Sequence, residues 1–116
     1  MLIYLIEDDP DWQSYYQDLL TPAHALKIFP DAITAIAAID ETPPAAIILD
    51  LLLVGQSGAA LLAELQSYPD TAAIPVALVS SVNITDALAD YGVSAVFNKA
   101  TFSPEELLSW ISAQQP

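Results

Sequence analysis

The chain has no cysteine and no arginine among its 116 residues. Without cysteine it can form neither a disulfide nor a thiolate zinc site, and it has no cysteine nucleophile. Its cations are Lys27 and Lys99, which stand against 15 acidic residues and leave a formal net charge of −13. Binding to a phosphate backbone or to an anionic membrane surface depends on clustered lysine and arginine. We therefore expect no direct contact with nucleic acid or with membranes.

Other shortages exclude further classes of protein. No apolar run reaches the length of a membrane-spanning helix, and the apolar residues 1–6 lack the basic leader of a signal peptide. His24 is the single histidine, expected to be exposed in a proline-flanked connection, so neither a Ser-His-Asp triad nor a histidine metal site is supported. Three glycines cannot supply a glycine-rich phosphate loop. We expect a cytoplasmic protein.

Apolar residues, in contrast, are plentiful. They make up 54% of the chain, while charged residues make up 15%. This composition excludes intrinsic disorder, because it supplies enough apolar surface to bury. The length suits a single domain over residues 1–116 and is too short for two domains of ordinary size.

Short apolar runs alternate with amphipathic segments of helical length along the whole chain. The apolar runs predict strands at 2–6, 25–29, 45–49, 75–79 and 94–98. The amphipathic segments predict helices that begin at Pro10, at Asp31, at Gly58, between 83 and 91, and at Pro104. Proline-containing breaks at 21–22, 42–44 and 69–70 end the first three helices.

Local signals predict several helix starts and inward faces. Asp9 suits an N-cap position with Pro10 as the first helical residue. Ser103 and Glu106 form a capping-box pattern around Pro104, and Gly92 is a plausible C-cap. Trp110 is interpreted as packing at the core. The helical spacing predicts these inward-facing stripes: Trp12, Tyr16 and Leu19; Ile33, Ile36 and Ile39; Leu61, Leu62 and Leu65; and Leu107, Leu108 and Ile111.

Strict alternation of strands and helices predicts an α/β fold with a parallel sheet covered on both faces, because right-handed crossovers place helices on either side. A closed eight-stranded barrel needs about 250 residues. An open, doubly wound sheet of five strands with five helices therefore remains. In such sheets functional groups collect at the carboxyl ends of the strands.

Polar side chains follow four of the five predicted strands: Glu7, Asp8 and Asp9 follow the first, Asp50 the third, Ser80 the fourth and Lys99 the fifth. Crowded carboxylates raise one another's pKa unless a cation compensates them. Mg²⁺ suits such a site, because it prefers oxygen ligands, keeps several waters and accepts a phosphate oxygen. Lys99 can pair with Asp50, which stands out because apolar residues precede it and follow it.

These residues, in this order, resemble the receiver domain of two-component response regulators. The resemblance covers the whole chain. It rests on the acidic pair Glu7 and Asp8 and on Asp50 as the phosphoacceptor. Three later residues complete it: Gly58 eight residues after Asp50, Ser80 thirty residues after Asp50, and Lys99 after the last strand. It implies a flavodoxin-like sheet with the strand order 2-1-3-4-5. It also implies a phosphoprotein that acts in phosphorelay signalling.

The resemblance implies a role for each matched residue. Asp50 would accept a phosphoryl group from a sensor histidine kinase or a phosphotransfer protein. Ser80 would bond a phosphoryl oxygen and Lys99 would pair with the phosphate, which suits the need of phosphoryl transfer for positioning and charge neutralisation. The metal would be Mg²⁺, and its ligands would be Glu7, Asp8, Asp50 and the backbone carbonyl of Leu52. Catalysis would be limited to the domain's own phosphorylation and dephosphorylation.

Three positions depart from the usual receiver pattern. Ala100 follows Lys99 where receivers usually have a proline after a cis bond, and a cis bond before a residue other than proline costs about 2.5–4 kcal/mol. Val96 stands where a tyrosine or phenylalanine usually rotates inward, three residues before the lysine. Val54 stands where a proline commonly follows the phosphoacceptor by four residues.

Two alternatives to a phosphoswitch stay open. Val96 and Ala100 favour a degenerate receiver that is never phosphorylated and acts as a constitutive protein-interaction module. A small Mg²⁺-dependent phosphohydrolase would need a general acid for the leaving group, and no residue suggests one.

The chain ends at 114–116, just after the last predicted helix. We therefore expect a stand-alone receiver whose output is the binding of a partner protein.

Overall fold

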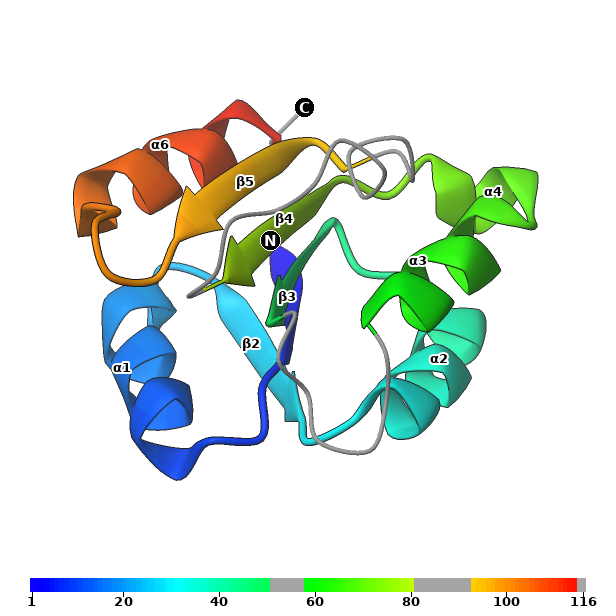
Figure 1. Ribbon diagram of the computed structural model, residues 1–116, viewed down its shortest axis with the longest axis horizontal. Helices are drawn as coiled ribbons and strands as arrows, with labels where there is room; N and C mark the ends of the chain where they lie inside the picture. Colours follow the sequence, from blue (N-terminus) through cyan, green and yellow to red (C-terminus); the bar gives the residue numbers. More distant parts are fainter. Residues whose placement is uncertain (51–57, 81–92, 115–116) are drawn as a thin grey trace.

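A computed structural model describes residues 1–50, 58–80 and 93–114, and within them five parallel strands form one sheet. The strands are β1 (Leu2–Ile6), β2 (Ala25–Phe29), β3 (Ala46–Asp50), β4 (Val76–Ser80) and β5 (Ala95–Asn98). Their order across the sheet is β2-β1-β3-β4-β5 (Figure 1). The predicted doubly wound α/β fold and its strand order are therefore confirmed, with strand limits that differ from the predicted ones by at most one residue.

Helices cover both faces of this sheet. The helices α1 (Pro10–Leu20) and α6 (Pro104–Ala113) lie on one face, and α2 (Ala32–Glu41) and α3 (Gly58–Gln66) lie on the other (Figure 1). A short helix, α4 (Pro69–Ala72), follows α3 and contradicts the interpretation of 69–70 as a simple break. Pro69 occupies the first helical position, where its missing N–H costs no hydrogen bond. The helix predicted between 83 and 91 and its cap at Gly92 lie outside the described residues.

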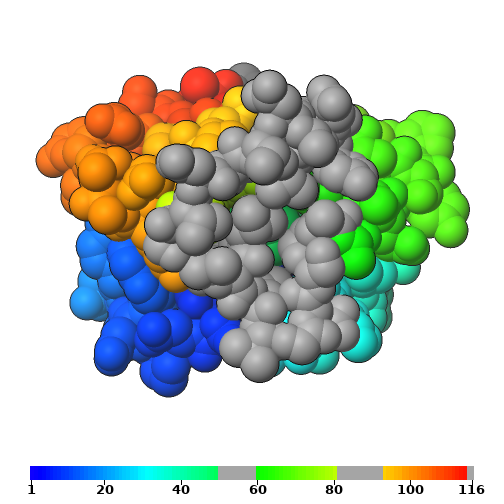
Figure 2. Space-filling view, in the orientation of Figure 1, coloured from blue at the N-terminus to red at the C-terminus, as the bar shows by residue number. Residues whose placement is uncertain are grey.

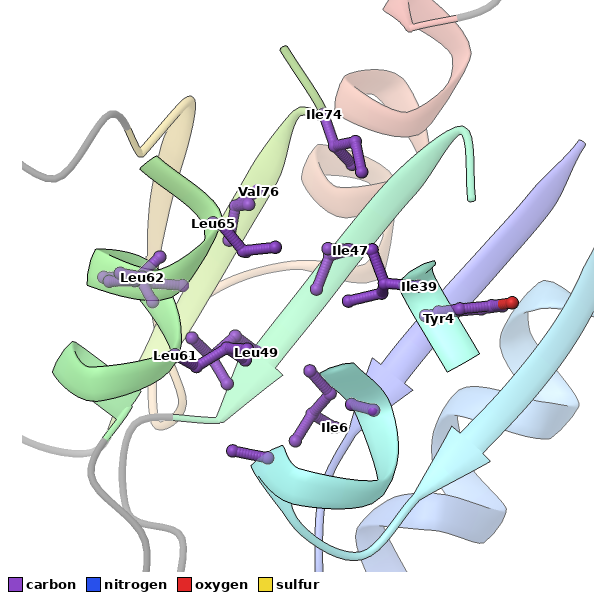
Figure 3. Close-up of a cluster of buried hydrophobic side chains, with 13 residues drawn as sticks. Tyr4, Ile6, Ile39, Ile47, Leu49, Leu61, Leu62, Leu65, Ile74 and Val76 are labelled. Atoms are coloured by element: carbon purple, nitrogen blue, oxygen red, sulfur yellow. The ribbon is translucent and has the colours of Figure 1, made fainter. Parts of the chain in front are cut away.

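Side chains alternate between the two faces along each strand and build one core layer under each pair of helices. Tyr4 and Ile6 of β1 face α2 and α3 together with Ile47 and Leu49 of β3 (Figure 3). Ile3, Leu5 and Ile48 belong to the opposite layer, which Tyr16, Leu20, Leu107 and Ile111 of α1 and α6 complete. The inward stripes predicted for α3 and α6 are confirmed. In α3 the buried residues are Leu61, Leu62 and Leu65. In α6 Leu107 and Ile111 are buried, and Leu108 packs against the same core layer.

The stripe predicted for α2 is wrong at one position. Ile33 is 64% exposed, whereas Ala32, Ala35 and Ile39 are buried and Ile36 packs partly against the core. The buried set follows the i, i+3, i+7 spacing of a helix face. Ile33 lies about 100° away from Ala32 around the helix axis, because an α-helix has 3.6 residues per turn. Two alanines, Ala32 and Ala35, therefore share the inward face with Ile39 in place of Ile33.

The predicted caps are present at two helix starts. The Asp9 side chain accepts a hydrogen bond from the backbone N–H of Asp11 at 2.8 Å, directly before Pro10. At α6, Ser103 Oγ accepts from the backbone N–H of Glu106 at 3.2 Å. Each cap satisfies one backbone donor that has no partner within its helix.

We expect the substitution Ser103→Ala to lower the free energy of unfolding by about 1 kcal/mol, because the Glu106 N–H loses its side-chain acceptor. Urea denaturation followed by circular dichroism measures the change. Ser112→Ala, near the end of the same helix, is the matched control and should leave the midpoint nearly unchanged. Equal effects of the two substitutions would show that the cap contributes nothing.

Candidate functional site

The carboxyl ends of the strands bring the predicted site residues to one edge of the sheet. Glu7 and Asp8 directly follow β1, β3 ends at Asp50, β4 ends at Ser80, and Lys99 directly follows β5. The strand register pairs Asp50 with Val79, so Asp50 and Ser80 end neighbouring strands at nearly the same level. The structure describes only the backbone of Asp50, and Leu52 lies outside the described residues. The roles predicted for those two residues therefore stay predictions.

Glu7 is the most deeply buried carboxylate in the described part of the chain, with 1% of its surface exposed. Its Oε1 accepts a hydrogen bond from the backbone N–H of Asp9 at 3.1 Å. Gln13 of α1 donates from Nε2 to the Glu7 carbonyl oxygen at 2.7 Å. These bonds hold the turn between β1 and α1 and fix the direction in which the carboxylate leaves the backbone.

Lys99 is the cation that faces this carboxylate. Its Nζ lies 3.4 Å from Glu7 Oε2, and 12% of the lysine side chain is exposed. The residues continue two rows that face the same layer: Ile3 and Leu5 precede Glu7, and Phe97 precedes Lys99. This shared face explains how they meet although β3 and β4 lie between their strands. The described ion pair of Lys99 is with Glu7. Its predicted pairing with Asp50 involves a side chain outside the described part of the structure and stays a prediction.

Trp12 is a contact of Lys99 that the sequence did not reveal. The lysine Nζ lies 4.8 Å from the centroid of the indole ring, within the range of a cation–π interaction. Trp12 is partly buried and, with Asp11, Tyr15, Phe102 and Lys99, lines an open pocket of about 280 Å³. Helical spacing predicted that Trp12 faces inward, which is correct. Helical spacing alone could not show that a residue facing inward from the first turn of α1 contacts Lys99.

The turn after β5 gives Lys99 a fixed backbone without a proline. The Lys99 N–H donates to the Ser80 carbonyl oxygen at 2.8 Å. The backbone carbonyl of Asn98 accepts from Thr101 and Phe102, and Asn98 Oδ1 accepts from the Ala100 N–H at 2.8 Å. The peptide bond between Lys99 and Ala100 is trans. Among the described residues the cis peptide bond is the one between Thr21 and Pro22. Hydrogen bonds to Asn98 thus define the turn.

Ser80 and Val96 differ sharply in burial. Ser80 is 1% exposed at the end of β4, beside β5. Val96 is 51% exposed on β5, where receivers usually carry an aromatic residue. An aliphatic side chain at this position cannot perform the inward rotation of an aromatic ring that the resemblance implies. Ser80, the predicted hydroxyl residue, is therefore buried, whereas Val96 at the predicted aromatic position is exposed.

The carboxylates at this edge suit a hard divalent cation, because carboxylate oxygens are the ligands that Mg²⁺ prefers. Asp8 is partly exposed beside buried Glu7, while Asp9 serves as the cap of α1. Among the described residues no group of three histidine, cysteine, aspartate or glutamate side chains is arranged to hold a metal ion. The predicted ligands also include the Asp50 side chain and the Leu52 carbonyl, which lie outside the described part of the structure.

His24 lies away from this edge, at the amino end of β2. The expectation that it is exposed is wrong: the ring is partly buried, and its Nδ1 lies 3.4 Å from the nitrogen of the chain's N-terminus. Burial and then the positive charge of that terminus lower the pKa of His24 below its ordinary value. Because the ring lies at the opposite end of the sheet, it takes no part in the carboxylate site.

Comparison with known proteins gives a consistent fold but a distant sequence. No protein-family model matches the chain. The sensor histidine kinase TmoS of Ectopseudomonas mendocina is 27% identical over 79 residues, which are 68% of this chain and 8% of that protein.

None of the helices in the described part of the chain is long and apolar enough to span a membrane.

Solved structures resemble the chain over nearly its whole length. The Mn²⁺-bound form of response regulator Rcp1 is 26% identical, with a TM-score of 0.79 over 97% of this chain and 89% of that one. The BeF₃-activated N-terminal receiver domain of RstA from Klebsiella pneumoniae is 23% identical, with a TM-score of 0.86 over 98% of this chain and 97% of that one. The resemblance to receiver domains is thus confirmed at the level of the fold.

Proposed function

We propose that this chain, which has the fold of a response regulator receiver domain, is a phosphoryl-accepting switch in two-component signalling with Asp50 as the acceptor. The observation that carries the proposal is the ion pair of Glu7 and Lys99 at the carboxyl edge of the sheet, 3.4 Å between Nζ and Oε2. It puts an ammonium group and a carboxylate on the edge where β3 ends at Asp50. A phosphoryl group needs positive charge close to it, which the ammonium group supplies directly and a carboxylate supplies by holding a metal ion.

The residues that would hold Mg²⁺ are Glu7, Asp8, Asp50 and the backbone carbonyl of Leu52. The carboxylates among them are oxygen donors, as this metal requires, and a response regulator of similar fold binds Mn²⁺. When bound, the metal would neutralise charge on the phosphoryl oxygens. Asp8 is more accessible than Glu7, which favours Asp8 as a direct ligand.

The chemical step is a transfer between two nucleophiles. A carboxylate oxygen of Asp50 attacks the phosphorus of a phosphohistidine, and the phosphorus–nitrogen bond breaks. Its electron pair returns to the imidazole, which then takes up a proton, and Asp50 becomes an acyl phosphate. Lys99 pairs with a phosphoryl oxygen, and the Ser80 hydroxyl donates a hydrogen bond to another. The new charge on Asp50 then biases the surface that a partner recognises.

The partners that fit this function are proteins. A sensor histidine kinase or a phosphotransfer protein would supply the phosphoryl group in the cytoplasm, and a further protein would bind the switched surface. With a net charge of −13 the chain repels nucleic acid, so direct binding to DNA or RNA is no part of the proposal. The same charge favours a donor with a basic docking surface, whose association would weaken as salt rises.

Intact mass spectrometry tests the proposal. After incubation with acetyl phosphate and Mg²⁺, we expect the protein to gain the mass of one phosphoryl group. Hydroxylamine should remove it, because it cleaves acyl phosphates, and a chelator added at the start should prevent the gain. An unchanged mass under conditions that phosphorylate a known receiver would refute the proposal and leave the constitutive interaction module.

That second function has one observation in its favour. Val96 is 51% exposed at the position where receivers usually switch an aromatic side chain. A module that binds its partner without phosphorylation has no need of such a switch. It would bind its partner equally well with and without acetyl phosphate and Mg²⁺, which separates the two functions.

A further inference from the structure

The Lys99 ammonium group lies between a carboxylate and an aromatic ring. Its Nζ is 3.4 Å from Glu7 Oε2 and 4.8 Å from the centroid of the Trp12 ring. Because 12% of the lysine side chain is exposed, little water screens either contact. Tryptophan provides the strongest cation–π partner among the aromatic side chains, and the interaction grows when the cation is desolvated. The ring is therefore a substantial contact for the lysine head group.

The Trp12 ring is itself held in place by other aromatic rings. Its centroid lies 5.4 Å from that of Tyr15, 5.8 Å from that of Tyr16 and 6.5 Å from that of Phe102. Tyr15 and Tyr16 belong to α1, whereas Phe102 follows β5 and packs on Phe97, 6.0 Å between centroids. Figure 2 shows the surfaces of these two chain regions meeting, blue for α1 and orange for the residues before α6. The ring is thus anchored from both sides.

The same arrangement fixes the backbone that carries the lysine. Phe102 is the last residue of the turn that Asn98 organises, and its ring stacks with Trp12 at an interplanar angle of 29°. Lys99 is therefore restrained at both ends of its side chain: by the turn at its backbone, and by Trp12 and Glu7 at its ammonium group. Restraint of this kind lowers the entropy lost when a flexible lysine meets an anion.

We propose that Trp12 is a positioning residue for Lys99, whose indole face holds the ammonium group beside the carboxylates where a phosphoryl group arrives. The proposal rests on the proposed phosphoryl-accepting function and assigns that site a residue from α1. Trp12 touches neither the phosphoryl group nor the reacting atoms. It acts by limiting the directions that the Lys99 side chain can take.

Two aliphatic variants and one aromatic variant test this role through the rate of phosphorylation by acetyl phosphate with Mg²⁺. We expect Trp12→Leu to slow the reaction about tenfold, and Trp12→Phe, which keeps a ring face, to remain within about threefold of the wild type. Trp12→Met is the second aliphatic variant, for use if Trp12→Leu does not fold. Trp110→Leu makes the same change on α6 and should react like the wild type.

A second readout follows the lysine directly and needs no phosphorylation. The chain has two lysines, so Lys27→Met assigns both sets of side-chain resonances. Lys27 is exposed on the edge strand β2, and its signals should stay near random-coil positions. The ring current of Trp12 should shift the Lys99 methylene protons upfield. Trp12→Leu should abolish that shift, whereas Trp12→Phe should retain part of it.

The outcomes separate this proposal from the proposed function. A folded Trp12→Leu variant that reacts at the wild-type rate, or a Trp12→Phe variant as slow as Trp12→Leu, would overturn the role of Trp12 alone. Lys99 resonances without an upfield shift in the wild type would also overturn it. A wild-type protein that never gains mass would instead refute the phosphoryl-accepting function, and the positioning role for phosphate with it.

Discussion

Asp50→Asn is expected to abolish phosphorylation by acetyl phosphate completely, leaving the intact mass unchanged where the wild type gains one phosphoryl group. The amide has nearly the same shape as the carboxylate but lacks the negative oxygen that attacks phosphorus. Asp50 is the last residue of a central strand, and the three residues before it are fully buried. A nearly isosteric change at this position should leave the sheet intact, which circular dichroism can verify.

Asp9→Asn is the matched control, because the same change is made to an acid at the same edge of the sheet. The Asp9 side chain caps α1 by accepting from the Asp11 N–H, and asparagine caps a helix about as well as aspartate. We expect this variant to be phosphorylated like the wild type. Phosphorylation that persists in Asp50→Asn would instead place the acceptor elsewhere and contradict the proposed site.

The strand ends, and with them most of the site, could be predicted from the sequence. Fully apolar runs end at polar residues, and the carboxyl ends of parallel strands must meet at one edge, so Glu7, Ser80 and Lys99 could be assigned to it. The limits of the strands came within one residue for the same reason. This part of the prediction needed no knowledge of distances between elements.

The contacts of Lys99 could not be predicted, because they depend on how elements that are distant in the sequence approach each other. β1 and β5 are separated by two strands, so strand order alone does not suggest a bond between Glu7 and Lys99. The pair forms because both residues face the layer of α1, whose first turn brings Trp12 over the lysine. Alternation along the strands was the available signal, since it assigns Glu7 and Lys99 to the same face.

Two errors in the helices have a different physical origin. At α2 the larger isoleucines outweighed the alanines in the apolar pattern, although small residues let a helix approach a sheet closely; Ala32 and Ala35 are buried and Ile33 is exposed. At α4 the helix has four residues, which is close to a single turn and too short for helical periodicity. Apolar periodicity therefore does not identify the packed face where its side chains are small, nor a helix that is only about one turn long.

Lys99→Met is expected to lower the free energy of unfolding by about 3–5 kcal/mol in the absence of Mg²⁺, because removal of one member of a buried ion pair leaves the other charge uncompensated. Glu7 is 1% exposed, so its charge is poorly solvated once the ammonium group is removed. Such a loss is a large part of the total stability of an ordinary domain, which is about 5–15 kcal/mol. Urea denaturation, extrapolated to water, measures it.

The control for this substitution is the chain's other cation. Lys27 is exposed on β2, so Lys27→Met should change the free energy of unfolding by no more than about 0.5 kcal/mol. The double variant Glu7→Gln with Lys99→Met removes both charges and should recover most of the stability lost by Lys99→Met, since buried ion pairs can be replaced by neutral groups at little cost. If the double variant is no more stable than Lys99→Met, the lost stability comes from the contact of the lysine side chain with Trp12 and not from the unpaired charge of Glu7. Stability at this edge would then depend on the aromatic ring more than on the ion pair.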